Sequence, residues 1–270
     1  MNPLITALKL RIKKSPYRKL GISWIVEKTI KHRTSVCPKR IKILGKVVNY
    51  LRDEEIVHCL KEIFFDQAYS FKTSNPNPYI IDCGSHIGMS ILFYKLKYPN
   101  AIIVGFEPDN SNFELLQQNV KAWNFENVSL MNQPVWISEE IVGFNASGAM
   151  GGRIEKSQDQ ANSTIPIKAA RLSSLLNKKV DFLKIDIEGA EYEIIKDCEQ
   201  KLNFVENLFI EFHSTHKEQH KLIEILSILE KCKFDFYIKE ANNIYAIPFN
   251  KKKSNSPFDL QLNIFAFRNA

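Results

Sequence analysis

From Tyr79 onwards the sequence alternates short runs of β-branched and other apolar residues with segments of helical periodicity. This alternation is typical of a parallel sheet that is covered by helices on both faces. The predicted strands are 79–83, 101–106, 128–131, 180–187 and 208–212, and the predicted helices between and after them are 88–98, 110–123, 191–199 and 217–231. Two last strands, 234–238 and 262–267, have no helical pattern between them. We therefore expect a doubly wound α/β sheet that ends in a hairpin.

The composition agrees with a globular domain that has a large core. Of the 270 residues, 44% are hydrophobic and 25% are charged, which excludes collagen-like and disordered classes. No apolar run reaches the ~18 residues that a membrane-spanning helix needs. The five cysteines are scattered without metal-site spacing, which favours a reducing compartment. Since the first residues also lack the pattern of a signal peptide, we expect a cytoplasmic protein, soluble or peripheral at the inner membrane surface.

The first 50 residues are strongly basic. They carry thirteen Lys and Arg residues against Glu27 alone, a net charge of +12, while the remaining residues carry −5. Such an arm can attract an anionic membrane or a phosphorylated glycan carrier, or it can pack on the core or on a second subunit of a homo-oligomer. Nucleic acid is not expected as a partner, because no aromatic residues are interleaved with the charges. We divide the chain into two parts. The first is a basic helical N-terminal segment, 1–72, with an apolar and cationic stretch at 4–14 and a helix at 53–71, and the second is a main domain, 73–270.

The first two predicted strands of the main domain end in a pattern that suits a nucleoside. Asp82, Gly84 and Gly88 form a DxGxxxG turn between strand and helix, where glycines let a ligand approach the backbone. The pattern differs from the GxGxxG that cradles a pyrophosphate, so a mononucleoside is favoured over a dinucleotide. Glu107 ends the next strand about 20 residues later, where a carboxylate can accept both ribose hydroxyls.

The strand at 180–187 carries charges on one of its faces. Lys184, Asp186 and Glu188 alternate with apolar residues and so point to the same side. Buried charges need partners or a ligand. They form either an internal ion-pair network, with Lys184 paired to Asp186 or Glu191, or part of an active site.

The following strand brings a histidine to the same edge. Glu211 and His213 share one side, and a histidine beside carboxylates can take a proton from a hydroxyl. Asp186, Glu211 and His213 could instead hold a divalent metal ion, which we rank below a metal-free base because ligands from two strands must lie at matching depth. His216 and His220 share a helical face with His213, but we interpret them as solvated residues.

In chain order, the segments DCGSHIG, GFEPD, KIDIEGAE, IEFHS and DLQLNIFAFR resemble the FkbM-type family of S-adenosylmethionine-dependent methyltransferases. The resemblance runs from about Tyr79 to Arg268. KIDIEGAE is its most specific motif, whereas most class I methyltransferases share the first two. The resemblance implies a Rossmann-like class I methyltransferase fold, a seven-stranded mostly parallel sheet with an antiparallel last strand. It also implies O-methylation, commonly of sugar or polyketide hydroxyls, with S-adenosylmethionine as cofactor.

The resemblance also assigns a cofactor site. The residues expected to contact S-adenosylmethionine are Asp82, Gly84, Ser85, His86, Gly88, Glu107, Val135 and Trp136. Ser85 and His86 stand where the family usually has Ala-Asn. The third strand is followed by no carboxylate for the adenine amino group, so we expect backbone and apolar contacts around Val135 and Trp136.

The catalytic residues are expected at the ends of the two charged strands. The candidates are His213 or Lys184 as the base, Asp186 and Glu211 as groups that orient it or bind hydroxyls, and Glu188 and Glu191 as contacts to the acceptor. A polar segment, 143–164, is expected to cover a small-molecule or glycan acceptor.

Two alternative functions remain at this point. One is a nicotinamide-dependent sugar-modifying enzyme on the same type of sheet, against which the missing GxGxxG and YxxxK patterns argue. The other is a non-catalytic glycan- or membrane-binding module on a methyltransferase scaffold, against which the retained Gly84, Gly88 and Glu107 weigh.

Overall fold

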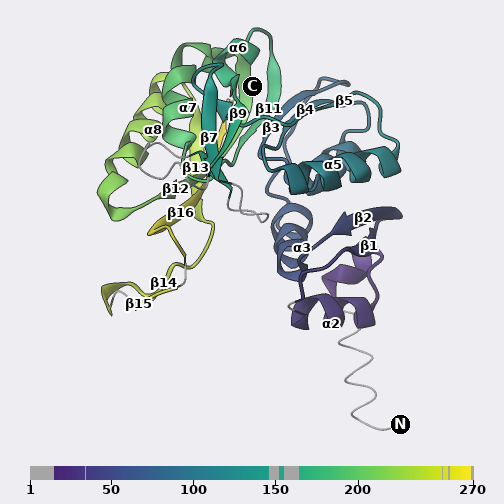
Figure 1. The fold of residues 1–270 in the computed structure, drawn as a ribbon. Coiled ribbons are helices and arrows are strands. Elements are labelled where there is room, and N and C mark those ends of the chain that lie inside the picture. The colour runs from purple at the N-terminus through teal and green to yellow at the C-terminus, as the bar shows by residue number, and fades with distance from the viewer. Residues whose placement is uncertain are drawn as a thin grey trace.

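The computed structural model of the protein describes residues 15–33, 35–145, 152–154, 164–250, 252–254 and 256–268. At its centre is a seven-stranded sheet with the strand order β13-β16-β12-β11-β3-β4-β5 (Figure 1). Its strands are β3 (Tyr79–Cys83), β4 (Ile102–Phe106), β5 (Val128–Met131), β11 (Val180–Ile185), β12 (Val205–Ser214), β13 (Asp235–Glu240) and β16 (Leu260–Phe267). β16 runs antiparallel to both of its neighbours, and the other pairs are parallel. The doubly wound, class I methyltransferase-like sheet predicted from the sequence is confirmed.

Helices cover both faces of this sheet because successive strand residues point to opposite sides. Ile80 belongs to the core beneath α4 (Met89–Lys97) and α5 (Asn110–Trp123). Ile81 belongs to the opposite core, beneath α6 (Leu172–Leu175), α7 (Glu191–Cys198) and α8 (His220–Lys231). All six residues of β11 are buried, so this strand lies between two apolar layers with two charged residues inside, Asp181 and Lys184.

The N-terminal segment forms a small layer of its own beside α5 (Figure 1). Its elements are a 3₁₀-helix (Pro16–Leu20), α2 (Trp24–His32), an antiparallel hairpin of β1 (Lys39–Ile43) and β2 (Lys46–Tyr50), and α3 (Asp53–Cys59), which continues as a π-helix, η2 (Leu60–Phe65). The sequence prediction of a purely helical segment is therefore wrong for 39–50. The helix expected over 53–71 ends at Phe65, and Gln67 has a positive φ of 52° that a helix does not allow.

This layer is fixed to the main domain by hydrogen bonds between β2 and α5. Lys46 Nζ donates to the Trp123 carbonyl at 2.9 Å, and Trp123 Nε1 donates to the Val47 carbonyl at 2.7 Å. Asn119 Oδ1 accepts the Asn49 backbone N–H at 2.7 Å. Residues 15–50 thus pack on the main domain, and the contact of their exposed basic residues with an anionic surface stays a prediction. The apolar and cationic stretch at 4–14 lies outside the described residues.

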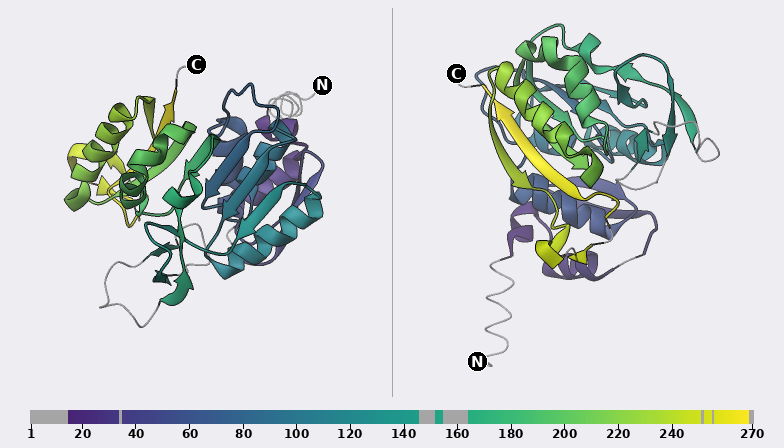
Figure 2. Two further views of the ribbon diagram at one scale, coloured as in Figure 1. Left: turned by 90° about the horizontal axis from the view of Figure 1, so that it is seen from above. Right: turned by 90° about the vertical axis from the view of Figure 1, so that its left-hand side faces the viewer.

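Short strands form small sheets of their own at two places outside the main sheet. β6 (Val135–Trp136) pairs with β10 (Ala170–Arg171), and between them β7 (Ile141–Asn145), β8 (Arg153–Ile154) and β9 (Ile165–Lys168) form a three-stranded sheet. A second hairpin, β14 (Tyr245–Ile247) and β15 (Lys252–Lys253), precedes β16. Figure 2 shows both extensions projecting from the body of the molecule. Within the described residues, no helix is long and apolar enough to cross a membrane.

Candidate active site

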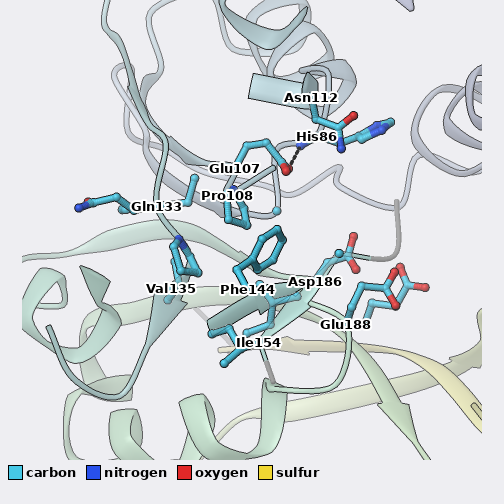
Figure 3. Close-up of a pocket in the computed structure, with 16 residues that line it drawn as sticks. His86, Glu107, Pro108, Asn112, Gln133, Val135, Phe144, Ile154, Asp186 and Glu188 are labelled. Atoms are coloured by element: carbon cyan, nitrogen blue, oxygen red, sulfur yellow. Dashed lines mark hydrogen bonds between the residues drawn. The ribbon is translucent and has the colours of Figure 1, made fainter. Parts of the chain in front are cut away.

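A pocket opens where the central strands of the sheet have their carboxyl ends (Figure 3). This is the position at which ligands bind in open α/β sheets. It is lined by Gly84, His86, Phe106, Glu107, Pro108, Asn112, Gln133, Pro134, Val135, Phe144, Gly152, Ile154, Asp186, Ile187, Glu188 and Glu211.

The turn after β3 forms one wall of the pocket. Gly84 has φ +94°, and a Cβ at this position would overlap the carbonyl oxygen of Asp186. The backbone N–H groups of Gly84 and Ser85 both donate to the Phe106 carbonyl, at 3.0 and 2.8 Å. Only a glycine therefore lets the turn lie against the end of β11 while it is held to the end of β4.

Glu107 closes the same wall from β4. Its carboxylate accepts the backbone N–H of His86 at 2.8 Å and that of Asp109 at 3.0 Å. The side chain is buried, and burial raises the pKa of Glu107 to about 7 despite these two hydrogen bonds. Each carboxylate oxygen keeps a further lone pair that can accept a ligand hydroxyl.

Lys184 lies beneath the turn and is almost fully buried. Its Nζ donates to the Gly84 carbonyl at 2.8 Å and pairs with Asp186 Oδ2 at 3.1 Å and Asp82 Oδ1 at 3.5 Å. Burial alone would lower the pKa of Lys184, but the two carboxylates outweigh it and raise that pKa above its ordinary value. The ammonium group is therefore a fixed positive charge that holds Gly84, Asp82 and Asp186 together.

His213 is surrounded by carboxylates. Its Nδ1 lies 3.1 Å from Glu191 Oε1, and its Nε2 lies 3.4 Å from Glu211 Oε1 and 3.6 Å from Glu188 Oε2. Burial works against the charged ring, but Glu191 and the other two carboxylates outweigh it and raise the pKa of His213 well above its ordinary value. The surrounding carboxylates therefore favour the protonated form of the ring.

Two glutamates beside this imidazolium have different environments. Glu191 is buried and accepts the Gly189 backbone N–H at 2.9 Å, so it fixes both the turn after β11 and the ring of His213. Glu188 has φ +58° in this turn, lines the pocket, and has a carboxyl pKa that burial raises to about 8. An unusual backbone conformation at a pocket residue is typical of functional sites.

The family profile described as the methyltransferase FkbM domain matches residues 82–236, which span the glycine turn, Glu107 and the charged cluster. The chain belongs to the FkbM methyltransferase family. Two curated relatives are Methyltransferase 1 of Beauveria bassiana (strain ARSEF 2860), 27% identical over 182 residues, and Methyltransferase sdnD of Sordaria araneosa, 28% identical over 187 residues. These alignments cover 58% and 56% of this chain and 72% of each relative. The solved structure of methyltransferase FkbM from Methylobacillus flagellatus KT is 15% identical, with a TM-score of 0.49 over 77% of this chain and 47% of that chain.

S-adenosylmethionine is the cofactor of this family, and the pocket of this FkbM methyltransferase fits it. Burial lowers the pKa of His86 to about 4, so its ring is neutral, and neither ring nitrogen has a hydrogen-bond partner among the described residues. Buried polar atoms without partners are costly, and a ligand group can satisfy them. A cavity of about 30 Å³ that shares Gly84, His86 and Asp186 with the pocket extends it under the turn.

Four of the predicted cofactor contacts do not line this pocket of the FkbM methyltransferase. Asp82 is fully buried and accepts a hydrogen bond from Ser90 Oγ at 2.5 Å. Ser85 is buried behind the turn and lines only the adjoining cavity. At Gly88 a Cβ would lie 2.8 Å from Leu116 Cδ1, so this glycine lets α4 and α5 pack closely.

Trp136 is the fourth predicted cofactor contact that does not line the pocket. It packs into the core beneath α7, because neighbouring residues of β6 point to opposite sides and Val135 takes the pocket side. Gly84, His86, Glu107 and Val135 do line the pocket, as the sequence predicts.

The structure adds pocket residues that the sequence analysis missed. Phe144 comes from β7, Gly152 directly precedes β8, Ile154 ends β8, and Asn112 comes from α5. Figure 3 shows Phe144 and Ile154 across the pocket from Glu107 and His86. Phe144, Gly152 and Ile154 belong to the segment 143–164, whose expected cover of the acceptor stays a prediction. The alternating pattern of IVGFN at 141–145 was the available signal.

The geometry also changes the expected catalytic roles. The raised pKa values of Lys184 and His213 argue against either group as the base, and the assignment of the base stays a prediction. Glu191 contacts His213 and does not line the pocket, and its contact to the acceptor stays a prediction. Asp186, Glu188 and Glu211 do face the pocket.

The possible metal ligands are also brought together. One atom each of Asp186, Glu211 and His213 lies within 4.8 Å of the others. Each of them has a protein partner, Lys184 for Asp186 and the Glu211–His213 contact for the other two. The trio could therefore bind an ion only by giving up contacts that it already makes.

Proposed function

We propose that this FkbM methyltransferase is an O-methyltransferase whose acceptor is a hydroxyl of a sugar, a glycan or another small secondary metabolite. The observation that carries the proposal is the cluster of Glu188, Glu211 and His213 at the edge of the cofactor pocket. S-adenosylmethionine, when bound, supplies a methyl group that its sulfonium has already activated. What the protein must add is a position for the acceptor oxygen and a group that takes its proton.

Glu188 is suited to accept that proton by its position and by its pKa. It lines the pocket, and its raised pKa of about 8 lies close to neutral pH, where a general base works best. In the carboxylate form it accepts the hydroxyl proton, and the imidazolium of His213 beside it stabilises the charged form. Asp186 and Glu211 supply further acceptors for neighbouring hydroxyls, which suits a polyhydroxylated molecule.

The surrounding residues hold this arrangement in place. Glu191 fixes the ring of His213 from its Nδ1 side, so that Nε2 faces Glu188 and Glu211. Lys184 fixes Asp186 from below. These buried contacts restrict the rotation of the groups that face the acceptor, which is how a site is preorganised.

Methyl transfer from radiolabelled S-adenosylmethionine to a panel of sugars, glycans and polyketide alcohols tests the proposal, with mass spectrometry to locate the added methyl on oxygen. Glu188→Gln is expected to lower kcat by about 10²- to 10⁴-fold and to leave the affinity for S-adenosylhomocysteine unchanged. Glu224→Gln, on the exposed side of α8, is the matched control. Methylation on nitrogen or carbon, or a Glu188→Gln variant with full kcat, would overturn it. Cofactor binding without transfer to any acceptor would favour the non-catalytic module.

A further inference from the structure

A groove lies beside the active site, between η2 and the β13–β16 hairpin. It has a volume of about 580 Å³, within the ~300–1,000 Å³ range of ligand sites. The floor of the groove is the part of the sheet at β13 and β16 that α3 and η2 do not cover. We propose that this groove binds the sugar units of an oligosaccharide acceptor that lie beyond the methylated unit. This inference rests on the proposed function and names the substrate class of the same site.

The groove shares wall residues with hollows that adjoin the reaction centre. Glu188 lines both the cofactor pocket and a second hollow of about 410 Å³, and Asn242 lines both that hollow and the groove. On the other side, Glu62 lines both the groove and the small cavity under the glycine turn. A chain with one unit at Glu188 therefore has a direct path along β16.

Two buried amide oxygens along this path have no partner among the described residues. They are Gln261 Oε1, whose residue lines the second hollow, and Asn263 Oδ1, whose residue lines the groove. Asn263 is 5% exposed, and its Nδ2 donates to Glu62 Oε1 at 2.9 Å, which fixes the orientation of its amide. Because an unpaired buried acceptor is costly, both positions favour a ligand that donates hydrogen bonds, as sugar hydroxyls do.

An aromatic surface follows the two amides. Gln261, Asn263 and Phe265 occupy alternate positions of β16 and so share one face of the strand. Phe265 lies next to Tyr237 of β13, with ring centroids 6.2 Å apart, and Tyr237 is 63% exposed. Aromatic faces beside hydrogen-bonding groups suit the apolar face and the hydroxyl edge of a sugar ring.

The charges of the groove argue against other occupants. Glu62, Asp66 and Glu240 line it together with Lys61 and Lys239. Three carboxylates repel the phosphates of a nucleic acid. A surface this rich in charged residues also differs from the core of an interface with a second copy of the chain, where charged residues are depleted.

The test uses the full chain and a panel of neutral oligosaccharides of two to four units, each compared with its terminal monosaccharide. Binding is measured by saturation-transfer NMR in the presence of S-adenosylhomocysteine, so the readout does not depend on transfer. At least one oligosaccharide is expected to bind about tenfold more tightly than its monosaccharide, and Tyr237→Ala is expected to remove that difference. Phe236→Ala, on the opposite face of the same strand, is the matched control.

Asn263→Leu provides a second variant, and its melting temperature shows whether it is folded. The inference is overturned if oligosaccharides and monosaccharides bind alike, if the difference survives Tyr237→Ala, or if Tyr237→Ala dissociates a dimer in sedimentation. Binding that depends on Tyr237 without any methyl transfer would refute the proposed function and leave the groove assignment standing. Methyl transfer to a small acceptor that no groove variant affects would refute the groove assignment and leave the proposed function standing.

Discussion

Glu107 shows how a single buried carboxyl can make cofactor binding depend on pH. Its pKa is about 7 because burial disfavours the charged form. A carboxylate can accept two ribose hydroxyls, but a protonated carboxyl loses part of that capacity. We therefore expect the affinity for S-adenosylhomocysteine to rise between pH 6 and pH 8 in titration calorimetry. The Glu107→Gln variant, which cannot titrate, should lose this rise, and a wild-type affinity that is flat over this range would contradict the assignment.

Removing the carboxylate tests the same contact at constant pH. Glu107→Ala should weaken binding of S-adenosylhomocysteine by about 1 to 3 kcal/mol, since hydroxyls and the two backbone N–H groups lose their acceptor. Glu114→Ala, exposed on the first half of α5, should leave the affinity unchanged. Equal affinities of both variants would exclude a ribose contact at Glu107.

Metal dependence is decided by the Asp186, Glu211 and His213 trio. Since each of these side chains already has a protein partner, we expect methyl transfer to survive exhaustive chelation. The measurement is the initial rate before and after treatment with EDTA, with zinc, magnesium and manganese added back. A rate that falls after chelation and returns with one of these ions would instead assign the trio as a metal site.

At the residue scale, spacing alone located Gly84 and Glu107, because both belong to the regular ends of strands. The protonation states of Lys184 and His213 could not be predicted in this way. The pKa of Lys184 depends on Asp82 and Asp186, and that of His213 on Glu191, which follows a turn with positive φ at Glu188 and Gly189. Such a turn cannot be recognised from the sequence, because its conformation depends on where the fold places both strands.

At the scale of elements, the central strands were predictable because they are continuous apolar runs buried on both faces. The β1–β2 hairpin was missed, although its residues alternate in burial and flank Gly45. Its many lysines favoured the interpretation of a solvated arm. The alternation of KRIKI and KVVNY around Leu-Gly is in fact a hairpin signal, and Arg40 and Lys42 occupy exposed positions in it.

Two glycine turns of this fold provide a controlled comparison. Gly45 and Gly84 have φ of +86° and +94°, but only at Gly84 does a Cβ overlap another backbone atom, the Asp186 carbonyl oxygen. Gly45→Ala should lower the free energy of unfolding by about 1 to 2 kcal/mol, the cost of the left-handed conformation. Gly84→Ala should cost roughly 1 to 3 kcal/mol more, from the added overlap. Denaturant melts measure both, and equal losses would show that the turn after β3 can relax away from β11.

The whole molecule joins a basic N-terminal layer to a mildly acidic main domain through one shared core. Ile41, Ile43 and Val48 are buried in the core that also contains Leu116 and Trp123 of α5. A deletion of residues 1–50 should therefore expose that core and abolish the cooperative thermal transition. A deletion of residues 1–14 removes none of these contacts, and it should keep the transition within a few degrees of the full chain, as measured by circular dichroism.

The charge asymmetry predicts where the molecule meets an anionic surface. Arg18, Lys28, Arg33, Arg40 and Lys42 are exposed on the N-terminal layer, and Ile25 beside them on α2 is 71% exposed. A basic residue near an anionic membrane contributes about 1 kcal/mol, and this attraction falls off within a Debye length of ~8–10 Å. Only one side of the layer can face a membrane at once, so attachment should be weak, reversible and sensitive to salt.

We expect the full chain to co-sediment with vesicles that contain phosphatidylserine, not to bind vesicles of phosphatidylcholine, and to dissociate at high salt. Lys28→Glu with Arg33→Glu should reduce co-sedimentation without changing methyl transfer, because neither residue lines the cofactor pocket. Binding that ignores lipid charge, or that both substitutions leave intact, would show that the basic layer serves packing alone.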